Sequence, residues 1–129
     1  LQQAHEIQKN AAQIGFDFPN VQDAYGKLEE ELEEFKQAMR TNNSDEILDE
    51  FGDCLFSLVN VGRKLGVSSE MALLSTIHKF RSRFAFIEDQ AAIQNKNIEN
   101  MSLEEMDELW EQAKVYLKHQ VKNDNKKEE

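Results

Sequence analysis

The sequence is poor in residues that form tight turns, end helices or cross-link the chain. Its 129 residues include one proline, five glycines and one cysteine. A β-sandwich needs a turn about every ten residues, so this scarcity argues against an all-β fold. The single cysteine, Cys54, excludes an intramolecular disulfide, and its apolar neighbours predict a small buried residue. The fold must therefore consist of long segments held together by packing.

Long apolar runs and an excess of positive charge are missing as well. No stretch is long enough to span a bilayer, and the N-terminal residues lack the apolar segment of a signal peptide. The formal net charge is −10 at pH 7, so the phosphates of a nucleic acid would be repelled. A small polyphosphate can still bind if a divalent cation stands between it and the carboxylates. We expect a cytoplasmic protein that binds neither a membrane nor a nucleic acid. Because the sequence begins at Leu1 rather than methionine, we also expect it to be part of a longer chain.

What the sequence does contain is apolar residues at helical spacing along nearly its whole length, with no sustained period-two alternation. The pattern predicts helices over about residues 1–14, 21–39, 45–65, 69–87 and 103–117. The helix over 45–65 is apolar around more than half of its circumference, so we expect it to be the most buried element. Residues 1–118 would form one all-α domain, a bundle of four to five helices. Residues 119–129 would form a disordered polar tail.

Local signals mark the ends of these helices. Gly15 and Gly66 are expected to end the first and the third. Ser44 is the expected N-cap of the third helix. Ser102 and Glu105 have the spacing of a capping box and predict the start of the last helix.

Four acidic residues on the second and third helices stand out by their position. Acidic pairs three residues apart are expected by chance in so acidic a sequence. Their position relative to the apolar stripe therefore decides which of them are candidate functional residues. Glu31 lies between two stripe residues, and Glu34 follows one turn later. Asp53 lies in the most apolar part of the chain, with Glu50 three residues before it. Because a buried carboxylate is costly unless a cation or hydrogen bonds compensate, we expect Asp53 above all to be buried and functional.

Two such pairs on consecutive antiparallel helices would converge and offer a hard divalent cation up to eight oxygens. Mg²⁺ or Mn²⁺ fits better than Zn²⁺, since no histidine or cysteine lies with them at ligand spacing. Gly52, in the middle of a helix, indicates a close approach of another helix. A ferritin-like di-iron site is disfavoured because no acidic residue stands three positions before His5, His78 or His119. The alternative is that the acids line a solvated edge and balance Lys27 and Lys36.

The fourth helix carries a candidate counterpart of opposite charge. Lys79 and Arg83 are four residues apart on one face and can bind phosphate oxygens, although pairing with surface carboxylates is an equal alternative. Arg81 lies on another face and is expected to be solvated. Asn60 is a polar residue within an apolar run and must find a partner. It is either a structural hydrogen bonder or a candidate substrate contact.

Taken together, these residues resemble the MazG family of nucleotide pyrophosphohydrolases. The resemblance covers residues 15–114 and rests on the segments GFDFP at 15–19, KLEEELEE at 27–34, EFGDCLFSLVN at 50–60, KFRSRF at 79–84 and MSLEEM at 101–106, before Trp110. It implies an all-α NTP pyrophosphatase fold, assembled as a homodimer or homotetramer. Two positions depart from the usual pattern: Ser82 stands where many members have arginine, and Ile77 where an asparagine is frequent.

The resemblance also implies an activity: the Mg²⁺-dependent hydrolysis of an NTP or dNTP to the monophosphate and pyrophosphate. Mn²⁺ would be a substitute metal. Glu31, Glu34, Glu50 and Asp53 would be the metal-binding and catalytic residues, and Lys79 and Arg83 would bind the phosphates. The removal of aberrant nucleotides is the cellular role typical of the family. The competing hypothesis is a non-catalytic dimerisation or regulatory module that retains only a vestigial cation site.

Overall fold

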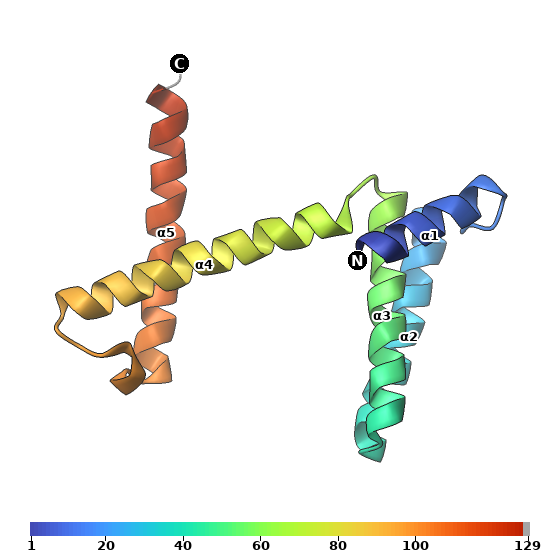
Figure 1. Ribbon diagram of the computed structural model, residues 1–129, viewed down its shortest axis with the longest axis horizontal. Helices are drawn as coiled ribbons and strands as arrows, with labels where there is room; N and C mark the ends of the chain where they lie inside the picture. Colours follow the sequence, from blue (N-terminus) through green and yellow to red (C-terminus); the bar gives the residue numbers. More distant parts are fainter. Residues whose placement is uncertain (128–129) are drawn as a thin grey trace. The chain divides into compact units, whose positions relative to one another are not determined.

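The computed structural model describes residues 1–127, without the side chains of residue 121 and of residues 123–127. All regular structure in this part of the chain is helical, which confirms the all-α prediction (Figure 1). The elements are α1 (Gln2–Gln13), α2 (Val21–Thr41), α3 (Ser44–Lys64), α4 (Ser69–Ile93), the short 3₁₀ helix η1 (Ile98–Asn100) and α5 (Leu103–Lys127). None of the described helices combines the length and apolar character needed to cross a membrane.

The helix ends follow the local signals, with one correction. Asn43, and not Ser44, caps α3: its side chain accepts hydrogen bonds from the backbone N–H groups of Asp45 and Glu46 at 3.0 and 3.3 Å. Both residue types are good N-caps, so the sequence alone left the position uncertain by one residue. The Ser102 hydroxyl accepts from the Glu105 N–H at 3.1 Å, as the capping box predicts. Gly66 adopts the left-handed φ of +75° that ends α3.

The chain divides into two compact units, Leu1–Leu73 and Leu74–Glu129. In the first unit, α2 and α3 lie side by side, joined by the short turn after Thr41, and α1 packs against α3 (Figure 1). Its buried cluster consists of Ala24, Leu28 and Val61, with Phe18 and Val21 packed against it. The antiparallel pair α2–α3 is what positions the acidic residues.

The second unit contains most of α4, η1 and α5. Its buried cluster consists of Ile87, Ala91, Met101 and Leu109, with Ile98, Met106 and Trp110 packed against it. Phe80 and Trp110 extend this packing, with ring centroids 5.4 Å apart. The helix pair α4–α5 therefore has a core of its own.

The expected single domain over residues 1–118 and the expected disordered tail over residues 119–129 stay predictions. The structure shows two units, and α5 continues to Lys127. No proline or glycine follows Gly66, so nothing in the sequence ends this helix at residue 118. Residues 128 and 129 of the expected tail lie outside the described residues.

α3 has more buried and half-buried residues than any other described helix, as expected for the third helix, but part of its apolar surface is exposed. Cys54 and Val59 of α3 are buried, but Leu48 and Leu58 are 73% and 53% exposed. Only α1 and α2 of the first unit pack on α3, so part of its apolar circumference stays uncovered. A Cβ added at Gly52 would meet no atom of the described residues within 4 Å, so no close helix among them explains that glycine.

Candidate functional site

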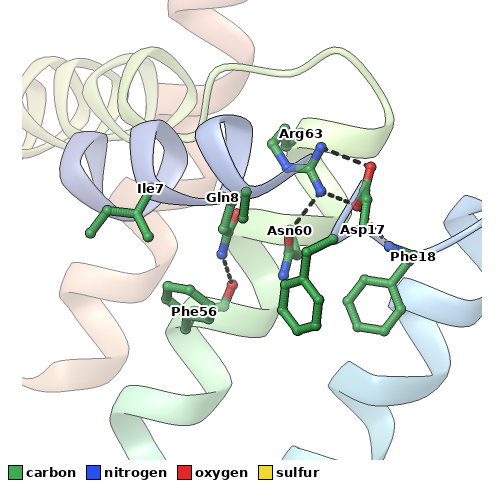
Figure 2. A pocket seen from close by; sticks show the side chains of 9 residues that line it. Ile7, Gln8, Asp17, Phe18, Phe56, Asn60 and Arg63 are labelled. Atoms are coloured by element: carbon green, nitrogen blue, oxygen red, sulfur yellow. Dashed lines mark hydrogen bonds and ion pairs between the residues drawn. The ribbon is translucent and has the colours of Figure 1, made fainter. Parts of the chain in front are cut away.

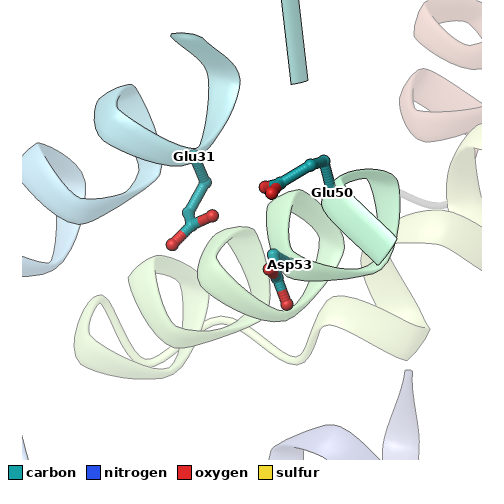
Figure 3. A group of neighbouring side chains, drawn as sticks. All are labelled: Glu31, Glu50 and Asp53. Carbon is teal, nitrogen blue, oxygen red and sulfur yellow. The ribbon is translucent and has the colours of Figure 1, made fainter. Parts of the chain in front are cut away.

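Three of the predicted carboxylates lie together in the first unit. Glu31 projects from α2, and Glu50 and Asp53 project from α3 toward it (Figure 3). One oxygen from each lies within 4.8 Å of the others. We call this group the acidic cluster. Its geometry follows from the short turn between α2 and α3, which places residues from the two i,i+3 pairs opposite one another.

The burial of these carboxylates is the reverse of the sequence expectation. Glu31 is only 6% exposed, whereas Asp53 belongs to the exposed residues and Glu50 is intermediate. The expectation that Asp53 would be the most buried is therefore wrong. The apolar residues around Asp53 in the sequence lie on a side of α3 that is itself half exposed, as Phe51 and Leu55 show. Apolar neighbours in sequence predict burial only where another element covers them.

Partners are missing for part of the cluster. Lys27, one turn before Glu31 on α2, places its Nζ atom 2.9 Å from Glu31 Oε1. The other oxygen, Oε2, is buried and has no hydrogen-bond partner in the described chain, and the same holds for Oε2 of Glu50. Buried carboxylate oxygens are normally satisfied, so two unpartnered ones within one acidic cluster are what a cation-binding site would show. The solvated-edge alternative accounts for the Lys27 contact and not for these two oxygens.

The electrostatics of the cluster point the same way. Removal from water, followed by the charge and hydrogen bonding of Glu34, raises the pKa of Glu50 above its ordinary value. The pKa of Asp53 is also raised, chiefly by removal from water and then by the charges of Asp49 and Glu31. Glu34, the fourth predicted residue, is thus a close neighbour of Glu50 without belonging to the group of three. A site where carboxylates raise one another's pKa is one that a cation would stabilise.

A hard divalent cation fits this donor set. The cluster offers only carboxylate oxygens, which suit Mg²⁺ or Mn²⁺ and not a soft metal. Cys54 is close enough for the acidic residues to raise the pKa of its thiol, after burial as the main cause. A raised pKa disfavours the thiolate form, which is the nucleophile and the metal ligand, so this thiol suits a structural role.

Asn60 lies away from the cluster, in the wall of a separate pocket of about 240 Å³ (Figure 2). Its Oδ1 atom accepts a hydrogen bond from Arg63 Nη2 at 3.0 Å, and Arg63 in turn pairs with Asp17. Arg63, then Lys64 and the Phe18 N–H, lower the pKa of Asp17 to about 2. Asn60 is thus a structural hydrogen bonder on its oxygen side. No residue of the described chain accepts a hydrogen bond from its NH₂ group.

Sequence reasoning did not find the other polar groups of this pocket. Gln8 is 5% exposed; its Nε2 atom donates to the Phe56 carbonyl at 2.8 Å, and its Oε1 atom is buried without a partner. Asp17 and Arg63 are 46 positions apart in sequence. An isolated glutamine on a helix and a long-range ion pair leave no periodic signal, so only the fold reveals them.

The predicted phosphate-binding residues lie in the second unit. Lys79 and Arg83 both line a cavity of about 520 Å³ between α4 and α5, and Arg81 does not. The Arg83 guanidinium lies 5.3 Å from the centroid of the Trp110 ring, a cation–π contact. Neither Lys79 nor Arg83 forms an ion pair with a carboxylate within the described side chains, so the surface-pairing alternative is not supported.

Comparison with known proteins identifies the family. Residues 20–85 match the model of the MazG nucleotide pyrophosphohydrolase domain, a segment that contains both helices of the acidic cluster and the Lys79–Arg83 pair. The chain belongs to the MazG family. The all-α fold expected from the resemblance is the one observed.

Individual MazG relatives extend the match beyond the domain model. The chain is 42% identical over 114 residues to a nucleoside triphosphate pyrophosphohydrolase/pyrophosphatase MazG of Thermotoga maritima, covering 88% of this chain and 44% of that protein. It is 35% identical over 116 residues to a nucleoside triphosphate pyrophosphohydrolase of Escherichia coli K12, with the same coverage. It is also 51% identical over 65 residues to the uncharacterized protein YabN of Bacillus subtilis, covering 50% of this chain and 13% of that one. The chain thus spans less than half the length of these relatives.

Proposed function

We propose that this chain hydrolyses nucleoside triphosphates, NTP or dNTP, to the monophosphate and pyrophosphate. The observation that carries the proposal is the acidic cluster, in which one buried oxygen of Glu31 and one of Glu50 have no hydrogen-bond partner in the described chain. The names of the Thermotoga and Escherichia relatives support the reaction. Water attacks the α-phosphorus, a P–O bond forms, and the bond from that phosphorus to the α,β-bridging oxygen breaks, so pyrophosphate leaves.

Glu31, Glu34, Glu50 and Asp53 would hold Mg²⁺, with Mn²⁺ as a substitute. When bound, the metal neutralises the polyphosphate and lowers the pKa of water. The carboxylates contribute two further functions of their own. They hold the metal between two antiparallel helices, and one of them accepts the proton of the attacking water.

Lys79 and Arg83 would bind phosphate oxygens, the lysine as a point charge and the arginine through its planar fork. Both cations are available because no carboxylate of the described residues pairs with them. The contact with the Trp110 ring restricts the orientation of the Arg83 guanidinium. A pre-oriented guanidinium loses less conformational entropy when the substrate binds.

Asn60 is the candidate contact for the nucleoside. Its pocket is bounded by the rings of Phe16, Phe18 and Phe56, whose faces suit a planar base. The NH₂ group of Asn60 and the Oε1 atom of Gln8 add a donor and an acceptor to this apolar wall. Replacement of Asn60 by Ala should raise KM and leave the metal affinity unchanged, whereas a purely structural role would lower thermal stability and leave KM unchanged.

The exposed apolar surface of α3 and α4 favours association with a second copy of the chain. Apolar side chains of α3 and α4 are largely exposed, among them Leu48, Met71 and Phe80. Exposed apolar surface of this extent is typical of an interface, and Gly52 offers a position where another backbone can approach. We therefore propose a homodimer or homotetramer as the active form.

The test is a panel of canonical and damaged NTPs and dNTPs, each incubated with Mg²⁺ or Mn²⁺ and analysed for the monophosphate. Wild-type protein should release equal amounts of monophosphate and pyrophosphate, and Glu50→Gln should not. A folded, oligomeric protein that converts none of the nucleotides would instead support the non-catalytic dimerisation or regulatory module.

A further inference from the structure

Gln8 of α1 lines the aromatic pocket of the first unit and is only 5% exposed (Figure 2). Its Nε2 atom donates to the Phe56 carbonyl of α3 at 2.8 Å. Because a carbonyl oxygen can only accept, this contact assigns the nitrogen and the oxygen of the Gln8 amide. The remaining atom, Oε1, is buried without a partner in the described chain. It is therefore an acceptor that lacks the N–H donor that buried acceptors normally have.

Asn60 of α3 is oriented in the same way. Its Oδ1 atom accepts a hydrogen bond from Arg63 Nη2 at 3.0 Å, and a guanidinium group can only donate. The NH₂ group of Asn60 is therefore the donor that this side chain offers to the pocket. Asp17 pairs with Arg63 and holds the guanidinium in place. The pocket thus has one acceptor, Gln8 Oε1, and one donor, Asn60 Nδ2, and a neighbouring residue sets the orientation of each.

The other walls of this pocket suit a flat ring. The side chains of Phe16, Phe18 and Phe56 line its volume of about 240 Å³. Phe16 is 83% exposed, so packing holds its ring least, and this ring can move when a ligand approaches the buried Gln8 oxygen. A flat ligand that satisfies both polar groups carries an N–H beside an acceptor on one edge. Proteins read nucleobases in this manner, by stacking on the ring and by hydrogen bonds to its edge.

The helix α3 also sets the distance from this pocket to the acidic cluster. Asn60 and Asp53 are seven positions apart, nearly two turns, so they lie on the same face of α3 about 10 Å apart along its axis. Both residues belong to the first unit. One nucleoside spans that length, so a base beside Asn60 would bring its α-phosphate to the cluster.

We propose that Gln8 is a specificity-determining residue that accepts an N–H of the base, so the chain takes nucleotides whose base carries an N–H beside an acceptor. This inference rests on the proposed function and adds a residue that precedes the matched segment 20–85. All four canonical bases have such an edge, so the requirement excludes modified bases. A base without the N–H leaves the Gln8 oxygen unsatisfied, and polar sites reject such analogues strongly.

The experiment compares kcat/KM for ATP and for purine ribonucleoside triphosphate, in which a hydrogen replaces the 6-amino group and no bulk is added. Wild-type protein should prefer ATP by at least about tenfold, mainly through KM. Gln8→Met removes the acceptor at similar size and should reduce the preference to within about twofold. Both substrates meet the same preparation, so partial unfolding of the variant leaves the ratio unchanged. Equal kcat/KM values in wild type would overturn the proposal without any variant.

Gln13→Met is the matched control, because Gln13 is an exposed residue of the same helix that does not line the pocket. It should keep the wild-type preference for ATP. A purely structural role for Gln8 predicts that Gln8→Met lowers thermal stability and slows both substrates equally. That result would overturn the proposal.

Binding of the free nucleosides separates this inference from the reaction on which it rests. Adenosine and purine riboside, which carry no phosphate, are titrated into the full chain without metal and followed by NMR. If NTPs are hydrolysed but wild type shows no preference for ATP, the role of Gln8 is wrong and the reaction stands. If no NTP is hydrolysed but wild type binds adenosine more tightly than purine riboside, and Gln8→Met does not, the base site stands and the reaction is wrong.

Discussion

Lys27 lies 2.9 Å from one carboxylate oxygen of Glu31, while the other oxygen of that carboxylate is buried without a partner in the described chain. The ammonium group therefore contacts one oxygen of a buried carboxylate that also lies close to Glu50 and Asp53. A divalent cation bound by the acidic cluster, as proposed, would compete with this ammonium group for Glu31. Replacement of Lys27 therefore distinguishes the role of Glu31 as an ion-pair partner from its proposed role as a metal ligand.

Lys27→Gln should strengthen the binding of Mn²⁺ about two- to fivefold, because it removes a positive charge beside the metal ligands. The same change should lower the thermal stability of the metal-free chain, since Glu31 loses its only ion-pair partner among the described residues. Metal titration and thermal unfolding measure the two effects. Weaker Mn²⁺ binding in this variant would show that Lys27 supports the site and does not compete with the metal.

Glu50→Gln should stabilise the metal-free chain at neutral pH. The folded state raises the pKa of Glu50, so it holds that proton more tightly than the unfolded state does. The free energy of unfolding therefore falls as the pH rises from the ordinary pKa of 4.5 through the raised value, and Gln removes this loss. Addition of Mg²⁺ should raise the melting temperature of wild type and not of the variant.

A structural salt-bridge role for the acidic cluster predicts the opposite result for Glu50→Gln, a lower melting temperature without metal. Glu33→Gln is the matched control, because Glu33 is an exposed acidic residue of α2 outside the cluster. It should change neither the pH dependence of stability nor the response to Mg²⁺.

Asp17→Asn should lower the free energy of unfolding at neutral pH by on the order of 1 kcal/mol. This is less than the pKa difference alone implies, because Asp17 lies in the exposed segment between α1 and α2, where water screens its ion pairs. Arg63 and Lys64 lower the pKa of Asp17 from 3.8 to about 2. The stabilisation is fully present above pH 3.8 and is lost as the pH falls through about 2. Acid unfolding curves should therefore converge for wild type and variant below pH 2. A constant difference down to that pH would contradict the ion-pair explanation.

Leu48→Glu should shift the oligomer toward monomer. Leu48 is 73% exposed on α3, so the charge costs little in the isolated chain and disfavours an apolar interface. Sedimentation velocity at several concentrations measures the shift, and Gln37→Glu on α2 is a charge control at an exposed polar position. An unchanged monomeric mass for wild type and variant would contradict the proposed homo-oligomer.

The helices and the acidic cluster were largely predictable from sequence, and the reasons are local. Apolar periodicity and the turn after Thr41 suffice to place Glu31 opposite Glu50 and Asp53. The order of burial was not predictable, because it depends on which side of α3 another element covers. Asp53 has apolar neighbours in sequence and is nevertheless exposed.

The polar groups that depend on tertiary contacts had no signal in the sequence. Gln8 reaches the backbone of Phe56 across 48 positions, and Arg63 reaches Asp17 across 46. Lys114 and Lys118 are ordinary surface lysines in the sequence, and only the packing of α5 on α4 places them at the cavity of Lys79 and Arg83. The sequence motifs therefore indicated the acidic cluster and the Lys79–Arg83 pair, whereas only the fold revealed Gln8, Arg63 and the two lysines of α5.

The position of the hydrolysed bond tests the central claim most directly. We would incubate a triphosphate with the chain and Mg²⁺ in H₂¹⁸O and analyse both products by mass spectrometry. The account predicts one ¹⁸O atom in the nucleoside monophosphate, none in the pyrophosphate, and a loss of rate on the order of 100-fold or more in Glu50→Gln. Release of nucleoside diphosphate and inorganic phosphate, or a Glu50→Gln variant with wild-type activity, would contradict it.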